Sequence, residues 1–551
     1  MNTSRSIDPK NGFCTETKTY HSLRPCVSLP PLSQPLSITD YALSILHQSP
    51  KTFSTTTTVL IDASTGRHLS YGEFLSQIRS LVSSLKTYFP SLSKGHVAFI
   101  LSPTSLHVPV LYFALLALGV IVSPANPIGS ESEVAHQVRL SNPVVAFATS
   151  SNSRKLPKLP LGTVLIDSPE FLSMLNSTTT QAYRVDVSQS DSAAILYSSG
   201  TTGRVKGVIL SHRNLIALIA GLTQLRHVSD PDPNDPLPVL FFTLPLFHVF
   251  GFFMAVRAVS MGETMVLMER FEFEGMLRAV EKYKVTYMPV SPPLVVALVK
   301  SDLVNKYDIS SLRGLGCGGA PLGKETAQLF NAKFPSVDIV QGYGLTETGG
   351  GAARTVGPEE SQRYGSVGRL AENMEAKIVD PATGEALPPG QKGELWLRGP
   401  TVMKGYVGDE KATTETLDSE GWLKTGDLCY FDSDGFLFIV DRLKELIKYK
   451  AYQVPPAELE HLLQSHPEIA DVAVIPYPDE EAGQIPMAFV VRKPGSNITE
   501  AQVIDFISKL VAPYKKIRRV SFINSIPKNP AGKILRRELV THALSAVSAR
   551  L

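Results

Sequence analysis

Residues 197–207 read Tyr197-Ser198-Ser199-Gly200-Thr201-Thr202-Gly203-Arg204-Val205-Lys206-Gly207 and follow the apolar run Ala193-Ala194-Ile195-Leu196. From Ser198 on, ten residues hold four hydroxyl side chains, three glycines and one lysine. Glycine lets backbone N–H groups approach an anion, hydroxyls add donors, and lysine adds a mobile charge. The pattern predicts a phosphate loop held between two strands. The alternative interpretation is an ordinary surface hairpin turn that binds no ligand. It is not a Walker loop, because no Gly-Lys-Ser/Thr follows at the required spacing.

Three further stretches carry nucleotide chemistry. Gly316-Cys317-Gly318-Gly319-Ala320-Pro321 is a small-residue turn against which a flat ring can lie, or else an ordinary strand–helix turn. In Gln341-Gly342-Tyr343-Gly344-Leu345-Thr346-Glu347-Thr348-Gly349, the tyrosine can stack on a base and the glutamate offers Mg²⁺ a hard oxygen. In Trp422-Leu423-Lys424-Thr425-Gly426-Asp427, the carboxylate can accept from both ribose hydroxyls, although Thr-Gly-Asp is also a common turn.

From Val59 to Glu538 the chain resembles the acyl-adenylate-forming enzymes, which include acyl-CoA synthetases, luciferases and peptide-synthetase adenylation domains. Within them it is most similar to the plant 4-coumarate–CoA ligases and ligase-like proteins. The decisive stretches, besides those above, are Asp441-Arg442-Leu443-Lys444-Glu445-Leu446-Ile447-Lys448-Tyr449-Lys450 and Pro527-Lys528-Asn529-Pro530-Ala531-Gly532-Lys533-Ile534-Leu535-Arg536-Arg537. The chain departs from the family at four places: Arg204-Val205 replaces a proline, Cys317 and Gly319 alter the adenine turn, Gly350-Gly351 replace Pro-Val, and Ala451 replaces a glycine.

The resemblance implies a nucleotide site and its metal. Glu347 would bind Mg²⁺. ATP or AMP would contact Ser198, Ser199, Gly200, Thr201, Thr202, Gly203, Lys206, Gly318, Gly319, Ala320, Gln341, Gly342, Tyr343, Gly344, Thr346, Asp427, Arg442 and Lys444.

The resemblance also implies the reacting groups. Lys533 is the adenylation lysine, His248 lies beside the acyl pocket, and Lys448 and Gln453 contact the adenylate or thioester site. His248 could titrate near neutral pH. Lys450 and Ala451 would lie by the CoA channel. The acyl pocket would be lined by His248, Phe250, Met254, Gly318, Gly344, Gly350 and Gly351, with the two consecutive glycines making it roomier.

The implied reaction has two steps. A carboxylate is a weak nucleophile and ATP is an anion, so their union needs charge neutralisation more than acid–base catalysis. Lys533 would stabilise the charge that spreads as acyl-AMP and pyrophosphate form. The small domain would then rotate about Lys444, withdraw Lys533 and admit the thiol of coenzyme A. The cofactors implied are therefore ATP, Mg²⁺ and CoA.

Length and composition fit this reading. A chain of 551 residues is too long for one core. Strand–helix alternation predicts an α/β fold, with a large N-terminal domain of layered subdomains over residues 1–441 and a small mobile domain over 442–551. The net charge of +2 argues against a nucleic-acid partner. The four scattered cysteines form no metal spacing or disulfide framework, which fits a reducing compartment.

One stretch imitates a membrane span, because residues 97–130 contain no Asp, Glu, Lys or Arg. Prolines and glycines divide it, so we expect strand 97–101, buried helix 108–118 and strand 120–122, with no membrane span. No secretory leader is evident. The final residues Ala549-Arg550-Leu551 are similar to the peroxisomal address Ser-Lys-Leu, with the cytoplasm as the alternative.

The sequence favours an ATP-dependent carboxylate–CoA ligase, monomeric by default. Its acid would be a hydroxycinnamate-class or related aromatic propenoic or dienoic acid. Benzoate-type acids, jasmonate precursors and medium-chain fatty acids stay open. Three other readings also stay open: a luciferase-type oxidase, an adenylation domain feeding a carrier protein, and a non-catalytic nucleotide-binding relative.

Overall fold

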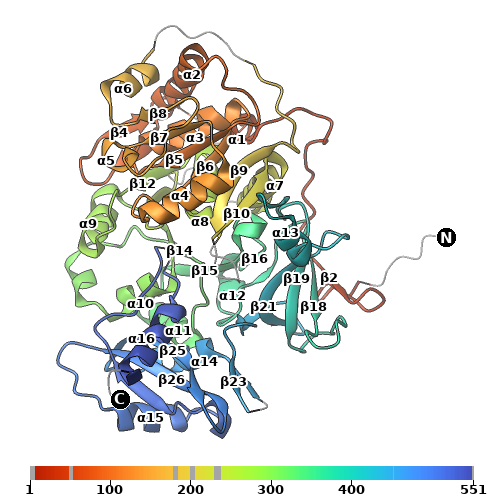
Figure 1. Cartoon of the computed structure of the whole chain (residues 1–551), viewed down its shortest axis with the longest axis vertical. Coiled ribbons are helices and arrows are strands. Elements are labelled where there is room, and N and C mark those ends of the chain that lie inside the picture. The colour runs from red at the N-terminus through yellow and green to blue at the C-terminus, as the bar shows by residue number, and fades with distance from the viewer. Residues whose placement is uncertain are drawn as a thin grey trace.

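The computed structural model describes residues 7–48, 54–177, 184–198, 205–228, 237–450, 452–530 and 532–548. In this part of the chain the strands form four sheets. Three sheets belong to the large N-terminal part, and the fourth forms a smaller C-terminal unit below it (Figure 1). The fold is α/β, as predicted.

A seven-stranded sheet holds the strands on either side of the predicted phosphate loop. Its order is β20 (Gly405–Tyr406), β10 (Lys206–Ser211), β9 (Ser192–Ser198), β6 (Ile121–Pro124), β5 (Val97–Leu101), β7 (Val145–Ala148) and β8 (Thr163–Leu165). Along the chain, these strands alternate with α2 (Tyr71–Tyr88), α3 (His107–Ala117), α4 (Glu131–Ser141), α5 (Ser150–Ser153), α6 (Pro169–Leu175) and α7 (His212–Val228). β9 and β10 are antiparallel, and Ser198 pairs with Lys206. The loop between them is therefore anchored at both ends, as expected.

A nine-stranded sheet carries the two glycine-rich turns. Its order is β17 (Arg369–Leu370), β16 (Ala353–Arg354), β15 (Asp338–Tyr343), β14 (Gly314–Cys317), β13 (Tyr287–Val290), β11 (Val239–Phe242), β12 (Thr264–Leu267), β3 (Thr58–Asp62) and β4 (His68–Ser70). The helices that precede or follow its strands along the chain are α1 (Ile38–Gln48), α8 (Val249–Ser260), α9 (Phe273–Tyr283), α10 (Pro292–Lys300), η1 (Asp302–Lys306), α11 (Lys324–Lys333), η2 (Thr346–Thr348) and α12 (Gly357–Ser361).

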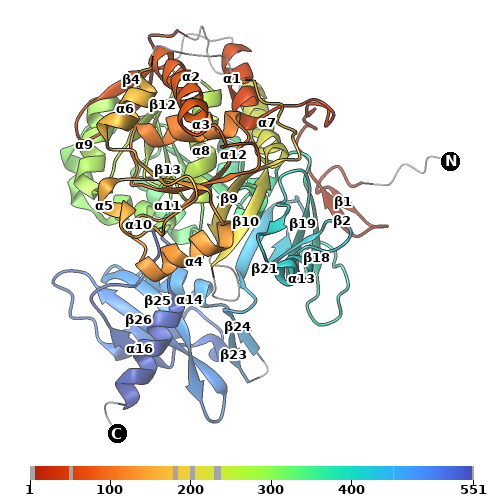
Figure 2. The same cartoon turned by 45° about the horizontal axis from the view of Figure 1, so that its top comes forward.

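A six-stranded sheet completes the large part. Its order is β1 (Phe13–Cys14), β2 (Thr19–His21), β18 (Glu375–Val379), β19 (Gly393–Arg398), β21 (Leu423–Phe431) and β22 (Leu437–Arg442), and α13 (Glu410–Thr416) accompanies it. The first two strands show that the N-terminal arm adds an edge to this sheet. Figure 2 shows this sheet beside β9 and β10.

The C-terminal unit has five strands. β24 (Tyr452–Val454), β23 (Ile447–Tyr449), β26 (Gly483–Arg492) and β25 (Ile469–Asp479) are neighbours, and β27 (Arg519–Phe522) pairs with β26. Its helices are α14 (Pro456–Gln464), α15 (Glu500–Ser508), η3 (Pro513–Lys515) and α16 (Arg536–Ser548). The last strand of the six-stranded sheet ends at Arg442 and the first strand of the C-terminal sheet begins at Ile447, so the linker between the two units is short. The domain boundary at 441/442 stays a prediction.

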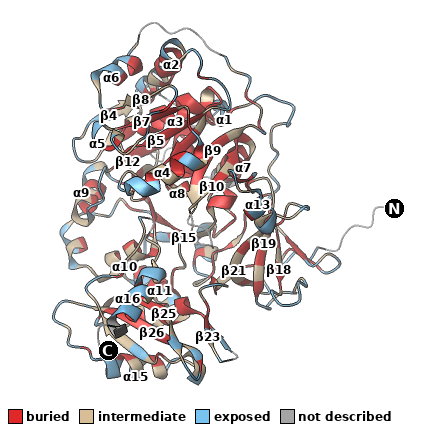
Figure 3. Cartoon of the chain, in the orientation of Figure 1, coloured by how far each residue is buried: buried red, intermediate tan, exposed pale blue. Residues whose placement is uncertain are grey.

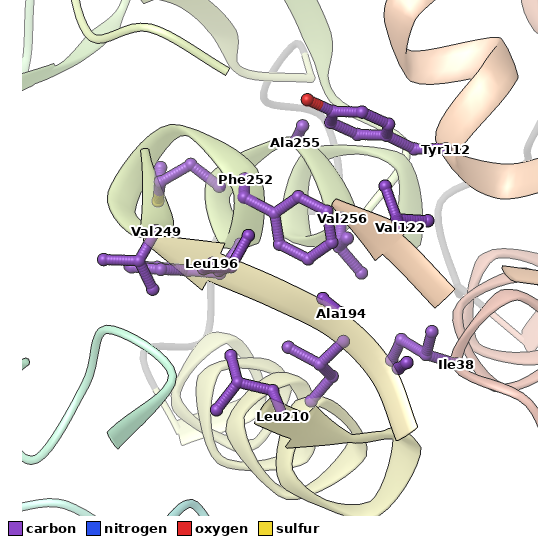
Figure 4. Packing of buried hydrophobic residues seen from close by; sticks show 14 of the residues in the cluster. Ile38, Tyr112, Val122, Ala194, Leu196, Leu210, Val249, Phe252, Ala255 and Val256 are labelled. Carbon is purple, nitrogen blue, oxygen red and sulfur yellow. The ribbon is translucent and has the colours of Figure 1, made fainter. Parts of the chain in front are cut away.

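The core explains the apolar stretch at 97–130. All five residues of β5 are buried, and α3 is apolar on every face because it lies inside the molecule (Figure 3). In Figure 4, Phe252 and Val256 of α8 pack beside Ala194 and Leu196 of β9. No helix within the described ranges combines the length and the apolar character that a bilayer crossing requires.

Candidate active site

Two adjoining cavities lie where the large and small units meet. One has a volume of about 480 Å³ and the other about 290 Å³. Residues from both units line both of them: Gly319, Gly344, Leu345, Arg442 and Lys533. The predicted adenine turn, the Tyr-Gly-Leu-Thr-Glu turn and the adenylation lysine therefore converge on one place.

Two parallel strands bring the glycine-rich turns together. β14 and β15 are neighbours, with Cys317 beside Gln341, so the turns that follow them meet at the same sheet edge. This edge is where open α/β sheets bind ligands. Ala320, Gly342 and Tyr343 line the larger cavity, whereas Thr346 and Glu347 line the smaller one. Gly318 and Gln341 belong to the same two stretches but line neither cavity.

Asp427 is buried between an aromatic ring and a cation. The Tyr343 hydroxyl donates to its Oδ2 over 2.6 Å, and Arg442 Nε lies 3.4 Å from its Oδ1. Burial raises the pKa of the Asp427 carboxyl, while Arg442 and the tyrosine oppose that shift. Asp427 and Arg442 face each other on β21 and β22. Sheet pairing thus joins two residues that the sequence separates.

Lys533 reaches this site from the small unit. Its backbone N–H donates to Oδ1 of Asn529 over 2.9 Å, and its carbonyl accepts from the Asn529 N–H. Its ammonium lies 4.0 Å from the Glu445 carboxylate. Burial, and then the charge of Arg442, lower the pKa of the lysine. Lys533 is therefore a desolvated cation inside a shared cavity.

Glu445 and its partners form a buried network at the linker that the sequence reasoning missed. Arg536 donates to Glu445 over 2.5 Å and to both oxygens of Glu460 over 2.8 and 2.7 Å. Asp441 Oδ2 accepts from the N–H of Ala457 at the start of α14. Lys444 lies on the same linker, where partial burial, followed by Arg442 and Lys533, lowers its pKa to about 8. The linker is thus tied to the small unit through α14 and Arg536.

The phosphate side of the site is described only in part. Ser199, Gly200, Thr201, Thr202 and Gly203 lie outside the described residues, as does Ala451. Ser198 lines the smaller cavity. The Lys206 ammonium lies 4.5 Å from the ring centre of Tyr406, whose hydroxyl donates to Glu347 Oε1 over 2.9 Å. Tyr406 therefore links two predicted ligand residues. The sequence reasoning passed over this tyrosine, because nothing in Lys404-Gly405-Tyr406 marks it as a site.

His248 lies at the N-terminus of α8 and lines the smaller cavity. Its Nδ1 accepts from the N–H of Phe250 over 3.3 Å. Burial lowers its pKa to about 4. The expectation that this histidine titrates near neutral pH is therefore wrong, since its imidazole is neutral at pH 7.

The consecutive glycines do not enlarge the predicted acyl pocket. A Cβ on Gly350 would lie 2.5 Å from two ring carbons of Phe253, and one on Gly351 would lie 2.8 Å from Leu218. The Phe253 ring stacks on Phe250, with centroids 5.4 Å apart. The side chains of Phe253 and Leu218 fill the space that the glycines leave, which corrects the expectation of a roomier pocket. A Cβ on Gly318 would lie 3.3 Å from the same stacked pair, at Phe250. Met254, which we also expected at the pocket, is buried in the core and lines neither cavity.

Three other predicted residues lie away from both cavities. Lys448 and Gln453 pair across the β23–β24 hairpin, and both are exposed. Lys450, at the tip of that hairpin, forms an ion pair of 2.8 Å with Glu481. In this arrangement none of the described residues of the hairpin lines either cavity.

Comparison with known proteins agrees with this geometry. A family model described as AMP-binding enzyme matches residues 46–407, and one described as AMP-binding enzyme C-terminal domain matches residues 458–533. The chain belongs to the AMP-binding enzyme family. The chain is 65% identical to 4-coumarate–CoA ligase-like 9 of Arabidopsis thaliana over 560 residues, which cover 100% of this chain and 99% of that protein. It is 46% identical to Peroxisomal OPC-8:0-CoA ligase 1 of the same organism, covering 98% and 99%.

Solved AMP-binding enzymes share the fold. The ATP-bound structure of MatB from Rhodopseudomonas palustris superposes with a TM-score of 0.81 at 26% identity, and the match covers 92% of this chain and 99% of that one. The chain is therefore an acid–thiol ligase of an ATP-dependent, acyl-adenylate-forming CoA ligase family, and the predicted 4-coumarate–CoA ligase-like relationship is confirmed.

Proposed function

We propose that this enzyme joins an acid with an apolar acyl part to coenzyme A through an acyl-AMP intermediate. One observation carries the proposal. Lys533 of the small unit lies in a cavity with Arg442, Asp427 and Tyr343, where its desolvated ammonium can meet both a carboxylate and the α-phosphate of ATP. A preorganised cation in such a site stabilises charge far better than it would in water.

The residues around the cavities support one orientation of ATP. Adenine would lie against Gly319, Ala320 and the ring of Tyr343. The ribose hydroxyls would donate to Asp427. The β- and γ-phosphates would then point toward Ser198 and Lys206, whose ammonium is free to leave the Tyr406 ring for a stronger anion. Ser199, Gly200, Thr201, Thr202 and Gly203, with Gln341, Gly342, Gly344 and Thr346, stay proposed contacts of this nucleotide.

Glu347 fits a divalent cation. It is a buried carboxylate at the cavity wall, held by Tyr406, and among the described residues no lysine or arginine forms an ion pair with it. No group of three or more metal-binding side chains occurs in the described ranges. A site of one carboxylate plus phosphates is typical of Mg²⁺. Mg²⁺ held by Glu347 would neutralise phosphate charge.

The first half-reaction then follows from these side chains. His248 is neutral and lies at the cavity wall, so it shapes the carboxylate site without adding charge. The substrate carboxylate attacks the α-phosphorus, the bond to the bridging oxygen breaks, and pyrophosphate carries away the electron pair. Lys533 stabilises the charge on both partners. No general base is needed, because the carboxylate is already ionised.

The second half-reaction requires the small unit to move. Lys448, Lys450 and Gln453 lie on an exposed hairpin away from the cavities, while Lys533 fills the place that a thiol must enter. Ala451, outside the described residues, stays a proposed residue of the CoA channel. We propose that rotation about Lys444 withdraws Lys533 from the cavity and brings the hairpin into its place. The linker between Arg442 and Ile447 is short, and a hinge of a few residues is enough to absorb a large change in φ and ψ. The boundary of this mobile domain would lie at 441/442.

The acid is proposed from the walls of the pocket. The side chains beside Gly318, Gly350 and Gly351 are all apolar: Leu218, Val249, Phe250 and Phe253. A buried phenolic hydroxyl among them would lack a partner, at a cost of about 1–3 kcal/mol. Cinnamate-class acids stay the first candidate, and this lining favours members without a free hydroxyl. It equally suits a jasmonate-precursor or medium-chain fatty acid, the second candidate, which the similarity to the OPC-8:0-CoA ligase also favours.

The location proposed is the peroxisome, with the cytoplasm as the alternative. Ala549-Arg550-Leu551, outside the described residues, and the name of the peroxisomal relative support it. A fluorescent protein fused before residue 1 should collect in peroxisomes and should lose that location when the tripeptide is changed to three alanines. An unchanged diffuse signal from both fusions would favour the cytoplasm.

We propose that the enzyme is a monomer.

The decisive experiment measures pyrophosphate release by the purified enzyme with ATP and Mg²⁺. The acids are cinnamic, 4-coumaric, benzoic, aryl-dienoic, jasmonate-precursor and fatty acids, each with and without CoA and with EDTA as a control. CoA-dependent turnover that is higher for apolar acids than for 4-coumarate is expected. A clear preference for 4-coumarate would contradict the pocket argument. If the protein binds nucleotide but releases no pyrophosphate with any acid, it would be a non-catalytic nucleotide-binding relative.

A further inference from the structure

Helix α10 of the large unit contacts the small unit at both of its ends. Figure 1 shows α10 and α11 facing the C-terminal unit around α14 and β25. The larger cavity is lined along this boundary by residues of α10. Nothing in the nucleotide chemistry above uses this helix, so its contacts with the small unit need another explanation.

The first contact lies at the N-terminal end of α10, next to the adenylation lysine. A Cβ on Gly532 would lie 2.8 Å from Ser291 Oγ and 3.5 Å from Pro293 Cγ. The bare backbone of Gly532 therefore sits directly on the start of the helix. Because Gly532 precedes Lys533 in the chain, this contact fixes the approach of the lysine to the cavity.

The second contact lies at the C-terminal end of α10. The Lys300 ammonium donates to the carbonyl of Gln464 over 3.0 Å and to that of Ile469 over 2.6 Å. Gln464 ends α14 and Ile469 begins β25. A cation at a helix C-terminus satisfies carbonyls that have no partner within the helix and interacts favourably with the helix dipole. Partial burial, followed by Lys493, lowers the pKa of Lys300 to about 8, so the ammonium still predominates at pH 7.

A second lysine holds the end of α10 in place. Lys333 of α11 donates to the carbonyls of Leu298, Val299 and Ser301 over 3.0, 2.9 and 3.3 Å. It caps α10 in the same way as Lys300 caps α14. Both partners of this contact belong to the large unit, however, so Lys333 provides a matched control for an effect on domain orientation.

We propose that α10 is the docking element of the small domain in the adenylating arrangement, and that Lys300 is its positioning residue. This rests on the proposed rotation between half-reactions. A helix of nine residues is about 13 Å long, so two contacts at its ends resist rotation of the docked domain far better than one. To present the hairpin that carries Lys448, the domain must break both Lys300 bonds. The half-buried ammonium can then return to water.

The test compares two half-reactions at pH 7. Adenylation is followed by ATP–pyrophosphate exchange with an acid that the wild type uses, and thioester formation by CoA consumption from supplied acyl-AMP. Lys300→Met keeps the apolar stem and removes the donors. Exchange should fall about tenfold, as expected for a lost charge-assisted bond, while thioester formation stays the same or rises. Lys300→Arg should restore most of the exchange.

Lys333→Met serves as the control, because it should lower the melting temperature without changing the ratio of the two rates. Equal loss of both half-reactions in Lys300→Met, or no change in their ratio, would overturn the proposal. So would an equal change of ratio in Lys333→Met. If Lys300→Met does not fold, Lys300→Gln, which keeps one short donor, takes its place with the same criteria. Wild-type enzyme that fails either half-reaction would refute the proposed function instead, independently of Lys300.

Discussion

The hydroxyl of Tyr343 donates to Oδ2 of Asp427 over 2.6 Å, joining residues 84 positions apart in the chain. If Asp427 holds the ribose, this bond orients the carboxylate while the ring stays available to the base. Tyr343→Phe should keep the ring and raise the KM for ATP about tenfold, with little change in kcat. Steady-state kinetics against ATP would measure this. Tyr430→Phe, on the same strand as Asp427, is the control and should leave the KM unchanged. An unchanged KM in Tyr343→Phe would show that the bond does not orient the ribose site.

Lys533→Ala should separate the two half-reactions. Loss of the desolvated ammonium removes the charge that stabilises the adenylation transition state, so acyl-AMP formation should fall at least about a hundredfold. Thioester formation from supplied acyl-AMP should continue. Single-turnover assays of each step would show this, and Lys509→Ala, an exposed lysine of the same unit, provides the control. Equal loss of both steps would refute the division of labour between the two arrangements.

Phe253 should set the size of the acyl pocket. Phe253→Leu would open space beside Gly350 and raise the ratio of kcat/KM for bulkier over smaller acids about tenfold. Phe252→Leu is the matched control. Its ring points to Tyr112, with centroids 5.2 Å apart, so it should cost similar stability without altering selectivity. Equal selectivity in both variants would place the acyl pocket elsewhere.

Burial of His248 makes the folded enzyme sensitive to acid. Its pKa is about 4 when folded and about 6.5 when exposed, so the unfolded chain binds more protons between these values. The contribution of His248 to the free energy of unfolding is fully present above pH 6.5 and is lost as the pH drops toward 4. Between pH 7 and 5 this group alone lowers the free energy of unfolding by about 2 kcal/mol. His212, also buried with a pKa of about 4, adds a loss of the same sign.

His248→Asn tests this, because asparagine keeps an oxygen that can cap α8 and does not titrate. The drop in melting temperature from pH 7 to pH 5 should be smaller in the variant than in the wild type. An identical drop would mean that His248 is not buried in the neutral form.

The double variant Gly323→Cys with His461→Cys should form a disulfide that locks the small domain on the large one. A Cβ on Gly323 would lie 3.1 Å from the His461 Cβ, so a shift of a few tenths of an ångström permits the bond. Gly323 has φ −62°, which any residue adopts. The oxidised double cysteine variant should keep ATP–pyrophosphate exchange and lose thioester formation more than tenfold. A reductant should restore it.

Oxidised wild type and the single variant Gly323→Cys are the controls, because the chain has four free cysteines of its own. Full CoA-dependent turnover by the cross-linked enzyme would show that the second step needs no rotation.

Much of the local structure could be predicted from the sequence. The strand at 97–101 has the expected bounds, and the buried helix and strand that follow differ by one or two residues. Hydrophobic runs divided by glycine and proline decide such elements locally. The same holds for the loop between β9 and β10, whose flanking strands pair as expected.

The details of the site were less predictable. Glycines at 350 and 351 predicted space, but whether a gap stays empty depends on side chains from distant helices, here Phe253 and Leu218. The neutral state of His248 depends on burial, which no spacing of residues reveals. Tyr406 lies on a short strand with no motif, and it reaches Glu347 because that strand pairs with β10 and the Met403 N–H donates to the Glu347 carbonyl.

The sequence by itself determined the chemistry, because the hydroxyl-rich loop, the Tyr-Gly-Leu-Thr-Glu turn and the Gly-Lys-Ile segment each carry the groups that adenylation needs. Only the tertiary structure decided how these groups meet. The pairing of β21 with β22 puts Arg442 opposite Asp427, and the docking of the small unit on α10 carries Lys533 into the cavity. Such contacts join residues far apart in the chain, so their energies depend on packing and burial rather than on local pattern.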